Sequence, residues 1–273
     1  MNRKIFFTDL DGTLLDSKKQ ISQENREAIE AVQNAGHSIV VATGRSTLNA
    51  IQQIRRLQLD QPGCYAITFN GSCVLRCDTG EILRWETLDM DTVRYIFAEA
   101  RKWGIHCQTY DEGETIAEAR SKELIRYDRN NGGHSRVVPD APAALVSEPP
   151  KILLAELEDR KRLERFQQEH EAAVQGKADS FFSCKEYLEY VPYGVNKGNA
   201  IVWLCDYLHI DIADTLAAGD AANDLSMINT AAIGAAMCNG EQAVKDAADY
   251  VTISDNDHSG VAEILKKFIL DVQ

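Results

Sequence analysis

Two stretches of this 273-residue chain alternate short apolar segments with amphipathic ones. In the first stretch the apolar segments are residues 4–8, 38–42 and 65–69, and amphipathic segments lie between them. The pattern returns at about residue 197 and continues to a last helix from Gly260. Apolar strands separated by amphipathic helices are typical of a parallel sheet covered on both faces. The alternation therefore predicts an α/β core, a doubly wound Rossmann-like parallel sheet.

Capping residues locate the helices of the first stretch. Ser22 is a good N-cap for a helix that continues to Ala35, and Gly36 follows as a stop. A second helix is expected over residues 47–59. The returning pattern predicts helices over 197–207 and 225–229 and strands over 215–218, 232–236 and 250–253.

The stretch between these two patterns is of another kind. It predicts helices over 91–103, 122–127 and 159–174, strands over 105–110 and 152–157, and a hairpin over 180–191. Residues 129–150 resemble a loop and hold most of the prolines. Because the strand–helix alternation resumes afterwards, we expect an α+β domain over 83–191, inserted into a core of 1–82 and 192–273.

Composition excludes several classes of partner. The net charge of -13 argues against nucleic acid, whose phosphate backbone requires a basic protein face, and against anionic membranes. An anionic substrate would have to be attracted by a local site and a metal rather than by the field of the whole molecule. The sequence leaves the oligomeric state open.

Neither a targeting segment nor a membrane span is expected. Acidic residues follow the N-terminal MNRKIFFT at once, and the apolar runs are far shorter than the roughly 20 residues that a spanning helix needs. Of the seven scattered cysteines, Cys73 and Cys77 are the closest pair, and their apolar stretch indicates buried thiols of a strand. No second Cys/His pair stands at metal-ligand spacing to complete a zinc site. We therefore expect a soluble cytoplasmic protein with free thiols.

Two carboxylates, Asp9 and Asp11, come directly after the first strand, and Gly12 and Thr13 let the chain turn. In a parallel sheet, functional groups gather at the carboxyl ends of the strands. Carboxylates this close repel one another, and a hard cation such as Mg²⁺ would relieve the repulsion. An acidic turn without a metal explains this short segment equally well, because Asp-Gly is a common turn pair.

Two further clusters offer groups for a phosphate. Thr43 and Gly44 end the second strand with a hydroxyl and an unhindered N–H, and Arg45 follows. A helix N-cap explains Thr43 as well, and Arg45 could be a solvated charge. Lys197 begins a helix and suits a phosphoryl group, although a lysine at that position is ordinarily a surface residue.

The last cluster is LAAGDAANDLSM. Asp220 follows a short buried strand, and Gly219 permits close approach of another segment. Asn223 and Asp224 stand at the start of the next helix. The cluster offers a further metal carboxylate at Asp220, although helix-capping loop residues would have the same composition.

Taken together and in this order, the clusters resemble the motifs of the haloacid dehalogenase superfamily, and within it the Cof-like phosphatases with the larger α/β cap. The first motif, DxDGT, is residues 9–13, the second is Thr43, the third is Lys197 and the fourth, GDxxND, is residues 219–224. The phrase FNG at 69–71 is also similar to this group. The resemblance covers nearly the whole chain, since the insertion falls between the second and third motifs.

The resemblance implies a mechanism. Asp9 would attack phosphorus and form an aspartyl phosphate that water then hydrolyses, with Asp11 as general acid and then general base. Mg²⁺ would be held by the Asp9 side chain, the Asp11 backbone carbonyl and Asp220. Asp224 would orient Lys197 or a metal-bound water. The groups expected to hold the phosphoryl oxygens are Leu10, Thr43, Gly44, Lys197 and Asn223.

The same resemblance implies a small phosphorylated metabolite as substrate, such as a sugar phosphate, and an inserted cap that contacts its leaving group. The candidate substrate contacts are Arg45, Asn70, Gly71, Tyr110, Asp111 and Glu112.

Three other classes share part of the pattern. A receiver-type switch also uses an aspartate nucleophile, Mg²⁺, a threonine and a lysine, but an acid at Asp11 and an inserted cap have no role in it. A phosphomutase on the same scaffold would return phosphate to its substrate. A dinucleotide-binding protein is disfavoured, because no GxGxxG follows any predicted strand.

Overall fold

The computed structural model describes residues 3–111, 114–131, 133 and 135–271. The chain divides into two compact units. We call residues 1–44, 50–84 and 196–273 the core unit, and residues 45–49 and 85–195 the inserted unit. Each is described by itself below.

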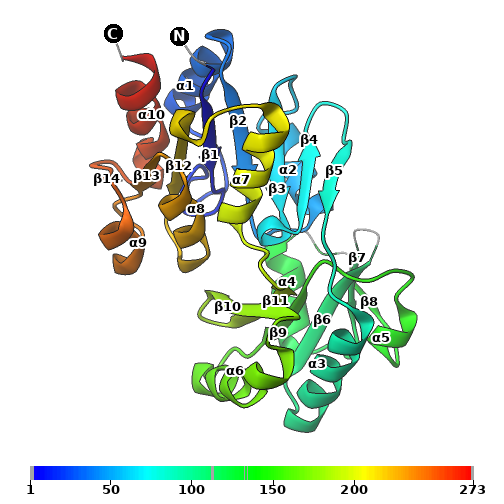
Figure 1. The fold of residues 1–273 in the computed structure, drawn as a ribbon. Helices are drawn as coiled ribbons and strands as arrows, with labels where there is room; N and C mark the ends of the chain where they lie inside the picture. Colours follow the sequence, from blue (N-terminus) through cyan, green and yellow to red (C-terminus); the bar gives the residue numbers. More distant parts are fainter. Residues whose placement is uncertain (1–2, 112–113, 132, 134, 272–273) are drawn as a thin grey trace. The chain divides into compact units, whose positions relative to one another are not determined.

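The core unit is built on one sheet (Figure 1), in which the described residues form eight strands in the order β14-β13-β12-β1-β2-β3-β4-β5. The strands from β14 to β3 are parallel, which confirms the predicted core, and β4 is antiparallel to β3. The strands are β1 (Ile5–Thr8), β2 (Ser38–Ala42), β3 (Cys64–Thr68), β4 (Cys73–Arg76), β5 (Ile82–Trp85), β12 (Thr215–Gly219), β13 (Ile233–Ala236) and β14 (Tyr250–Val251).

Strand β4 agrees with the interpretation of residues 73–77 as a strand with buried thiols. Strand β5 was not predicted, because its side chains are exposed or half-buried and carry little hydrophobic signal. At the other edge β14 has two residues rather than the four expected.

Helices cover both faces of this sheet. Side chains of β1 that point to one face, Ile5 and Phe7, join a buried apolar cluster with residues of α7 and α8. Phe6 points to the other face, where α1 contacts β2 and α10 (Figure 1). The core helices are α1 (Gln23–Asn34), α2 (Thr47–Arg56), α7 (Lys197–Leu208), α8 (Leu225–Thr230), α9 (Gln242–Ala247) and α10 (Gly260–Leu265).

The local signals explain most of these helix ends. The Ser22 side chain accepts a hydrogen bond from the Asn25 amide, as expected for the N-cap of α1, and Gly36 follows with φ +85°. Helix α2 stops at Arg56 instead of Leu59, because Gln58 adopts a left-handed conformation with φ 60°. Helix α9 was not predicted.

The inserted unit has its own sheet and its own core. Its described strands run in the order β10-β11-β9-β6-β7-β8, and α3 and α6 contribute to one buried apolar cluster with side chains of β6, β9 and β11. The elements are α3 (Met90–Trp103), β6 (His106–Asp111), β7 (Glu114–Ala117), α4 (Lys122–Asn131), β8 (Ser135–Val137), α5 (Ala141–Ala144), β9 (Ile152–Ala155), α6 (Arg160–Val174), β10 (Ala178–Cys184) and β11 (Tyr187–Pro192).

The expected loop over 129–150 is partly wrong, since it contains β8, which pairs with β7, and the single turn of α5. Strand β8 has three residues and mostly exposed side chains, so it carries no hydrophobic signal. In the described parts of the chain we find no helix that is long and apolar enough to cross a membrane.

Candidate active site

Three neighbouring strands of the core unit end in polar residues. Strand β1 lies between β12 and β2 in the sheet, and these strands are followed by Asp9, Asp220 and Thr43. The parallel ladder continues for one step beyond β1 and β2, because the Asp9 amide donates to the carbonyl of Ala218 and the Thr43 amide to that of Ile67. The sheet therefore gathers at one edge the groups that the sequence predicts to be together.

Lys197, the first residue of α7, is fully buried beside this edge. Asn196 caps the helix by accepting a hydrogen bond from the Asn199 amide. The Lys197 ammonium lies 2.7 Å from Asp9 Oδ1 and 2.6 Å from Asp224 Oδ1. The alternative of an ordinary surface lysine is thus excluded, and the lysine joins two carboxylates from distant parts of the chain.

Both oxygens of Asp224 have partners within the core unit. Oδ1 contacts Lys197, and Oδ2 accepts hydrogen bonds from the amides of Asp220 and Ala221 at 2.9 and 3.0 Å. Gly219 leaves room for this carboxyl, since a Cβ there would lie 2.5 Å from the Cβ of Asp224. Asp224 therefore holds Lys197 and the loop after β12 in place at the same time.

Asp220 contacts the turn that follows Asp9. The Thr13 hydroxyl donates to Asp220 Oδ1 at 2.7 Å. Gly12 has φ +87°, and a Cβ at Gly12 would collide with the Asp220 carboxylate. Gly12 and Thr13 were expected to let the chain turn, and nothing in the sequence pairs Thr13 with a residue 207 positions away.

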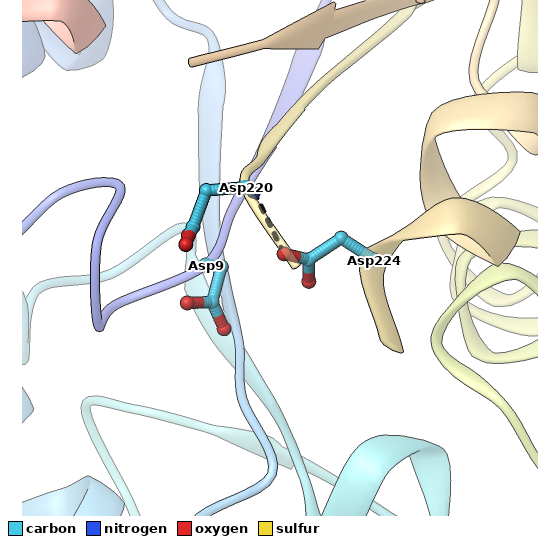
Figure 2. A group of neighbouring side chains, drawn as sticks. All are labelled: Asp9, Asp220 and Asp224. Atoms are coloured by element: carbon cyan, nitrogen blue, oxygen red, sulfur yellow. Dashed lines mark hydrogen bonds between the residues drawn. The ribbon is translucent and has the colours of Figure 1, made fainter. Parts of the chain in front are cut away.

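Carboxylates outnumber the lysine in this cluster. Asp9, Asp220 and Asp224 each place one oxygen within 4.8 Å of the others (Figure 2). Burial, followed by repulsion from neighbouring carboxylates, raises the pKa of Asp9 and of Asp220 above the ordinary carboxyl range, although Lys197 opposes the shift at Asp9. Burial disfavours the charge of Lys197, but Asp224 and Asp9 outweigh it and raise the pKa of the lysine.

An oxygen-preferring cation fits this donor set. It would offset the excess buried negative charge, and hard cations such as Mg²⁺ take carboxylate ligands. Asp9 and Asp220 are the better ligands of the three, because the hydrogen bonds of Asp224 already engage both its oxygens.

Asp11 lies outside this buried cluster. Its side chain is 37% exposed, and its Oδ1 lies 2.6 Å from the ammonium of Lys19, which is itself 55% exposed. Lys19 was not predicted as a partner, because a lysine in a surface turn carries no distinguishing signal. One carboxylate of the DxD pair is therefore buried and the other faces outward.

Asn70 connects three elements around the site. Its side-chain Oδ1 accepts a hydrogen bond from Asn223 Nδ2 at 3.1 Å. Its backbone N–H donates to the Thr43 carbonyl, also at 3.1 Å. A Cβ at Gly44 would lie 3.0 Å from the Asn70 side-chain amide, and a Cβ at Gly71 would lie 2.5 Å from the Asn196 carbonyl. The structure thus gives Asn70 and Gly71, predicted as substrate contacts, close partners within the protein.

The remaining candidate contacts belong to the inserted unit. Tyr110 and Asp111 lie in β6 and are buried, and the Tyr110 hydroxyl is 2.8 Å from that of Tyr127. Asp111 Oδ2 accepts a hydrogen bond from the Val146 amide. Arg45 is half-buried, and Glu112 lies outside the described residues.

Comparison with known proteins adds to this geometry. The family model of the haloacid dehalogenase-like hydrolases matches residues 6–265. A predicted phosphatase of Streptococcus pyogenes serotype M6 is 32% identical to this chain, over 99% of this chain and 100% of its own length.

Two further relatives are informative. The 5-amino-6-(5-phospho-D-ribitylamino)uracil phosphatase YcsE of Bacillus subtilis is 26% identical over 98% of this chain and 96% of its own. The crystal structure of a haloacid dehalogenase-like hydrolase from Bacteroides thetaiotaomicron matches with a TM-score of 0.89 and 31% identity, covering 98% of this chain and 100% of that one.

Proposed function

The chain belongs to the haloacid dehalogenase-like hydrolases and is a phosphatase of that family. We propose that it hydrolyses a small phosphomonoester through an aspartyl phosphate on Asp9 with the help of Mg²⁺. The buried contact between Asp9 and Lys197, beside Asp220, is the observation that carries the proposal. A carboxylate is a useful nucleophile only when it is held in position, and here a buried ammonium holds it.

In the first step an Asp9 oxygen attacks phosphorus, and a bond between them forms as the bond from phosphorus to the leaving oxygen breaks. Asp11, which faces outward, gives its proton to that leaving oxygen. Asp9 and Asp220 would hold Mg²⁺, together with the Asp11 backbone carbonyl, and the bound ion would supply neutralisation of the charge between nucleophile and phosphoryl group.

In the second step water attacks the phosphorus of the aspartyl phosphate. Asp11, now a carboxylate, takes a proton from this water, and the bond from Asp9 to phosphorus breaks to release inorganic phosphate. Lys197, Asn223, the Thr43 hydroxyl and the amides of the Leu10 and Gly44 segments would hold the phosphoryl oxygens in both steps. Support comes from their common origin at the ends of β1, β2 and β12 and the start of α7.

The inserted unit, we propose further, acts as the cap that selects the leaving group. It has its own sheet and its own buried core, and the expected motifs of the chemistry lie outside it. YcsE, by its name, acts on the phosphate ester of a ribityl chain, which supports a small polyol or sugar phosphate as the substrate class here. The candidate contacts remain Arg45, Asn70, Gly71, Tyr110, Asp111 and Glu112.

A phosphate-release screen over a panel of phosphorylated metabolites, with Mg²⁺ and with EDTA, tests the class of substrate. Asp9→Asn tests the mechanism, since the folded variant should release no phosphate and form no acid-stable phosphoryl adduct. Denaturing quench and mass spectrometry should place the adduct of the wild-type protein on the peptide that contains Asp9. Near-normal turnover by folded Asp9→Asn, or full activity after rigorous chelation, would contradict the proposal.

A further inference from the structure

The segment that carries Asp11 is held differently from Asp9. Asp9 is buried against Lys197, whereas the Asp11 side chain is substantially exposed, and so is its partner Lys19. Two backbone hydrogen bonds, from Leu14 to Asp9 and from Leu15 to Leu10, begin the turn that follows. Burial therefore does not fix the orientation of Asp11 as it does that of Asp9, and the position of the backbone after Asp11 contributes more to it.

Two asparagines that follow β13 and β14, the strands beyond β12 in the core sheet, bind carbonyls of this turn. Asn239, which follows β13, donates from Nδ2 to the Gly12 carbonyl at 2.8 Å. Asn256, which follows β14, donates from Nδ2 to the Leu15 carbonyl at 2.9 Å. The two are linked, since the backbone amide of Asn256 donates to Asn239 Oδ1 at 3.1 Å. The carbonyls on either side of residues 13 and 14 are thus both held by side chains.

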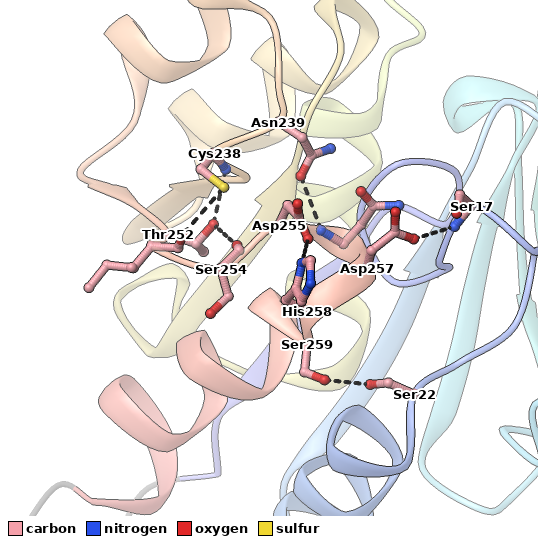
Figure 3. Close-up of polar contacts among 12 residues, drawn as sticks. Ser17, Ser22, Cys238, Asn239, Thr252, Ser254, Asp255, Asp257, His258 and Ser259 are labelled. Atoms are coloured by element: carbon pink, nitrogen blue, oxygen red, sulfur yellow. Dashed lines mark hydrogen bonds and ion pairs between the residues drawn. The ribbon is translucent and has the colours of Figure 1, made fainter.

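A third, exposed contact holds the same segment further along the chain. Asp257 Oδ1 accepts a hydrogen bond from the Ser17 amide at 2.7 Å (Figure 3). We call Asn239, Asn256 and Asp257 the latch. It fastens the segment 12–17 at three points that are spread along its length.

The latch is itself anchored. Glu263 of α10 accepts hydrogen bonds from the amides of Ile253 and Ser254. The Thr252 hydroxyl accepts from the Cys238 amide and donates to the Ser254 carbonyl, which joins the loops after β13 and β14 (Figure 3). Polar networks whose groups have hydrogen-bond partners are rigid. The loops after β13 and β14 can therefore hold the segment after Asp11 in one position.

We propose that Asn239, Asn256 and Asp257 are positioning residues that hold the backbone of residues 12–17 so that Asp11 meets the leaving oxygen of the substrate. The inference rests on the proposed role of Asp11 as general acid. A misplacement of a catalytic group by about 1 Å can lower the rate by on the order of 100-fold, so loss of one of three fastenings should lower it by about 10-fold. The loss should fall on proton transfer to the leaving group.

The test compares two substrates in the phosphorylation step, measured by rapid quench. In Asn239→Ala and Asn256→Ala the step should slow by about 10-fold for an alkyl phosphate and by less than about threefold for p-nitrophenyl phosphate, whose good leaving group needs little protonation. His258→Ala is the matched control. His258 lies in the same turn as Asn256 and pairs with Asp255 instead, so its loss should leave both rates unchanged.

A double-mutant cycle with Asp11→Asn completes the test. In the Asp11→Asn background, Asn256→Ala should have no further effect on either substrate, since the group it positions is gone. Equal slowing of both substrates, or an additive effect in the cycle, would reduce the latch to a structural element and overturn the inference. If Asn239→Ala does not fold, Asn256→Ala and the exposed Asp257→Ala decide.

The outcome also separates the two proposals. Should Asp11→Asn itself show no dependence on the leaving group, the proposed acid, and with it the mechanism, fails. Should Asp11→Asn show that dependence while the latch variants retain wild-type rates, the mechanism stands and the latch alone fails.

Discussion

Each unit of this protein buries a lysine, and the two lysines differ in the number of charges around them. In the inserted unit Lys151 lies 2.9 Å from Glu189, both side chains are almost inaccessible, and the second oxygen of Glu189 accepts from the Ser183 hydroxyl. In the core unit Lys197 is shared by Asp9 and Asp224, with Asp220 close by. In the first contact one carboxylate meets one ammonium; in the second, three carboxylates surround one ammonium and leave an excess of negative charge.

The number of carboxylates around each buried lysine distinguishes a structural contact from a candidate catalytic site. A one-to-one contact of lysine and carboxylate has no surplus charge, so its charges give no reason to expect a cation. A cluster with surplus carboxylates raises its own pKa values and is completed only by protons or by a cation. Burial of a lysine alone would not have distinguished the two.

Replacing each lysine in turn should show the difference between the two units most strongly. Lys197→Met and Lys151→Met should each lower the free energy of unfolding by about 3–5 kcal/mol, because each leaves buried carboxylate uncompensated. Only Lys197→Met should also lower turnover of acetyl phosphate, by roughly 1000-fold. Urea unfolding and phosphate release, measured where both variants are folded, check this. A similar loss of turnover in folded Lys151→Met would contradict the distinction.

Removing a carboxylate should have opposite effects in the two units. Without metal, Asp220→Asn should raise the free energy of unfolding by about 1 kcal/mol, because it removes buried repulsion while keeping an acceptor for Thr13. Glu189→Gln should lower it by about 3 kcal/mol, because it removes the charge of the carboxylate that lies 2.9 Å from the buried Lys151 ammonium. Urea unfolding in EDTA gives both values, and destabilisation by Asp220→Asn would refute the surplus of negative charge.

The surplus should also appear as a pH dependence. Since the folded-state pKa of Asp9 and Asp220 is raised, their protonated forms favour folding; that stabilisation is complete below about pH 4 and is lost as pH rises through the raised values. Mg²⁺ competes with these protons, so its increase of the melting temperature should be larger at about pH 8 than at about pH 5. Asp220→Asn should lose most of this increase, and Glu189→Gln should keep it.

The smallest effect is expected at Asn70. Its positive φ suits glycine, so Asn70→Gly removes the side chain that orients Asn223 without straining the backbone. We expect kcat/KM to fall by about 10-fold, with little change in the melting temperature. Asn70→Ala should lower the melting temperature further, because alanine resists this conformation. Wild-type kinetics in Asn70→Gly would show that Asn223 needs no such support.

Much of the core and its site could be predicted because one rule connects them. Parallel strands end at the same edge, so Asp9, Thr43 and Asp220 had to be neighbours once their strands were recognised. The burial of Lys197 could not be derived, since a lysine at the start of a helix carries the same local signal whether exposed or buried.

Contacts made by backbone atoms and by exposed turns could not be predicted. The asparagines at 239 and 256 bind carbonyls more than 200 residues away, and any asparagine in a loop has that capacity. Strands β5, β7 and β8 were missed, and in β5 and β8 no side chain is fully buried, so that these two strands carry little hydrophobic signal. The contact between the hydroxyls of Tyr110 and Tyr127 could not be predicted either, because nothing in the sequence pairs these two residues.

The distance along the chain between Asp9 and Lys197 has a consequence for biosynthesis. These partners are 188 residues apart, and β1 pairs with β12 only after the inserted unit has been translated, whereas its pairing with β2 is local. Contacts of such long sequence separation slow folding, and domains are generally completed as units during synthesis. A nascent chain that stops before Lys197 therefore carries Asp9 without its ammonium partner, and premature release should yield protein without turnover.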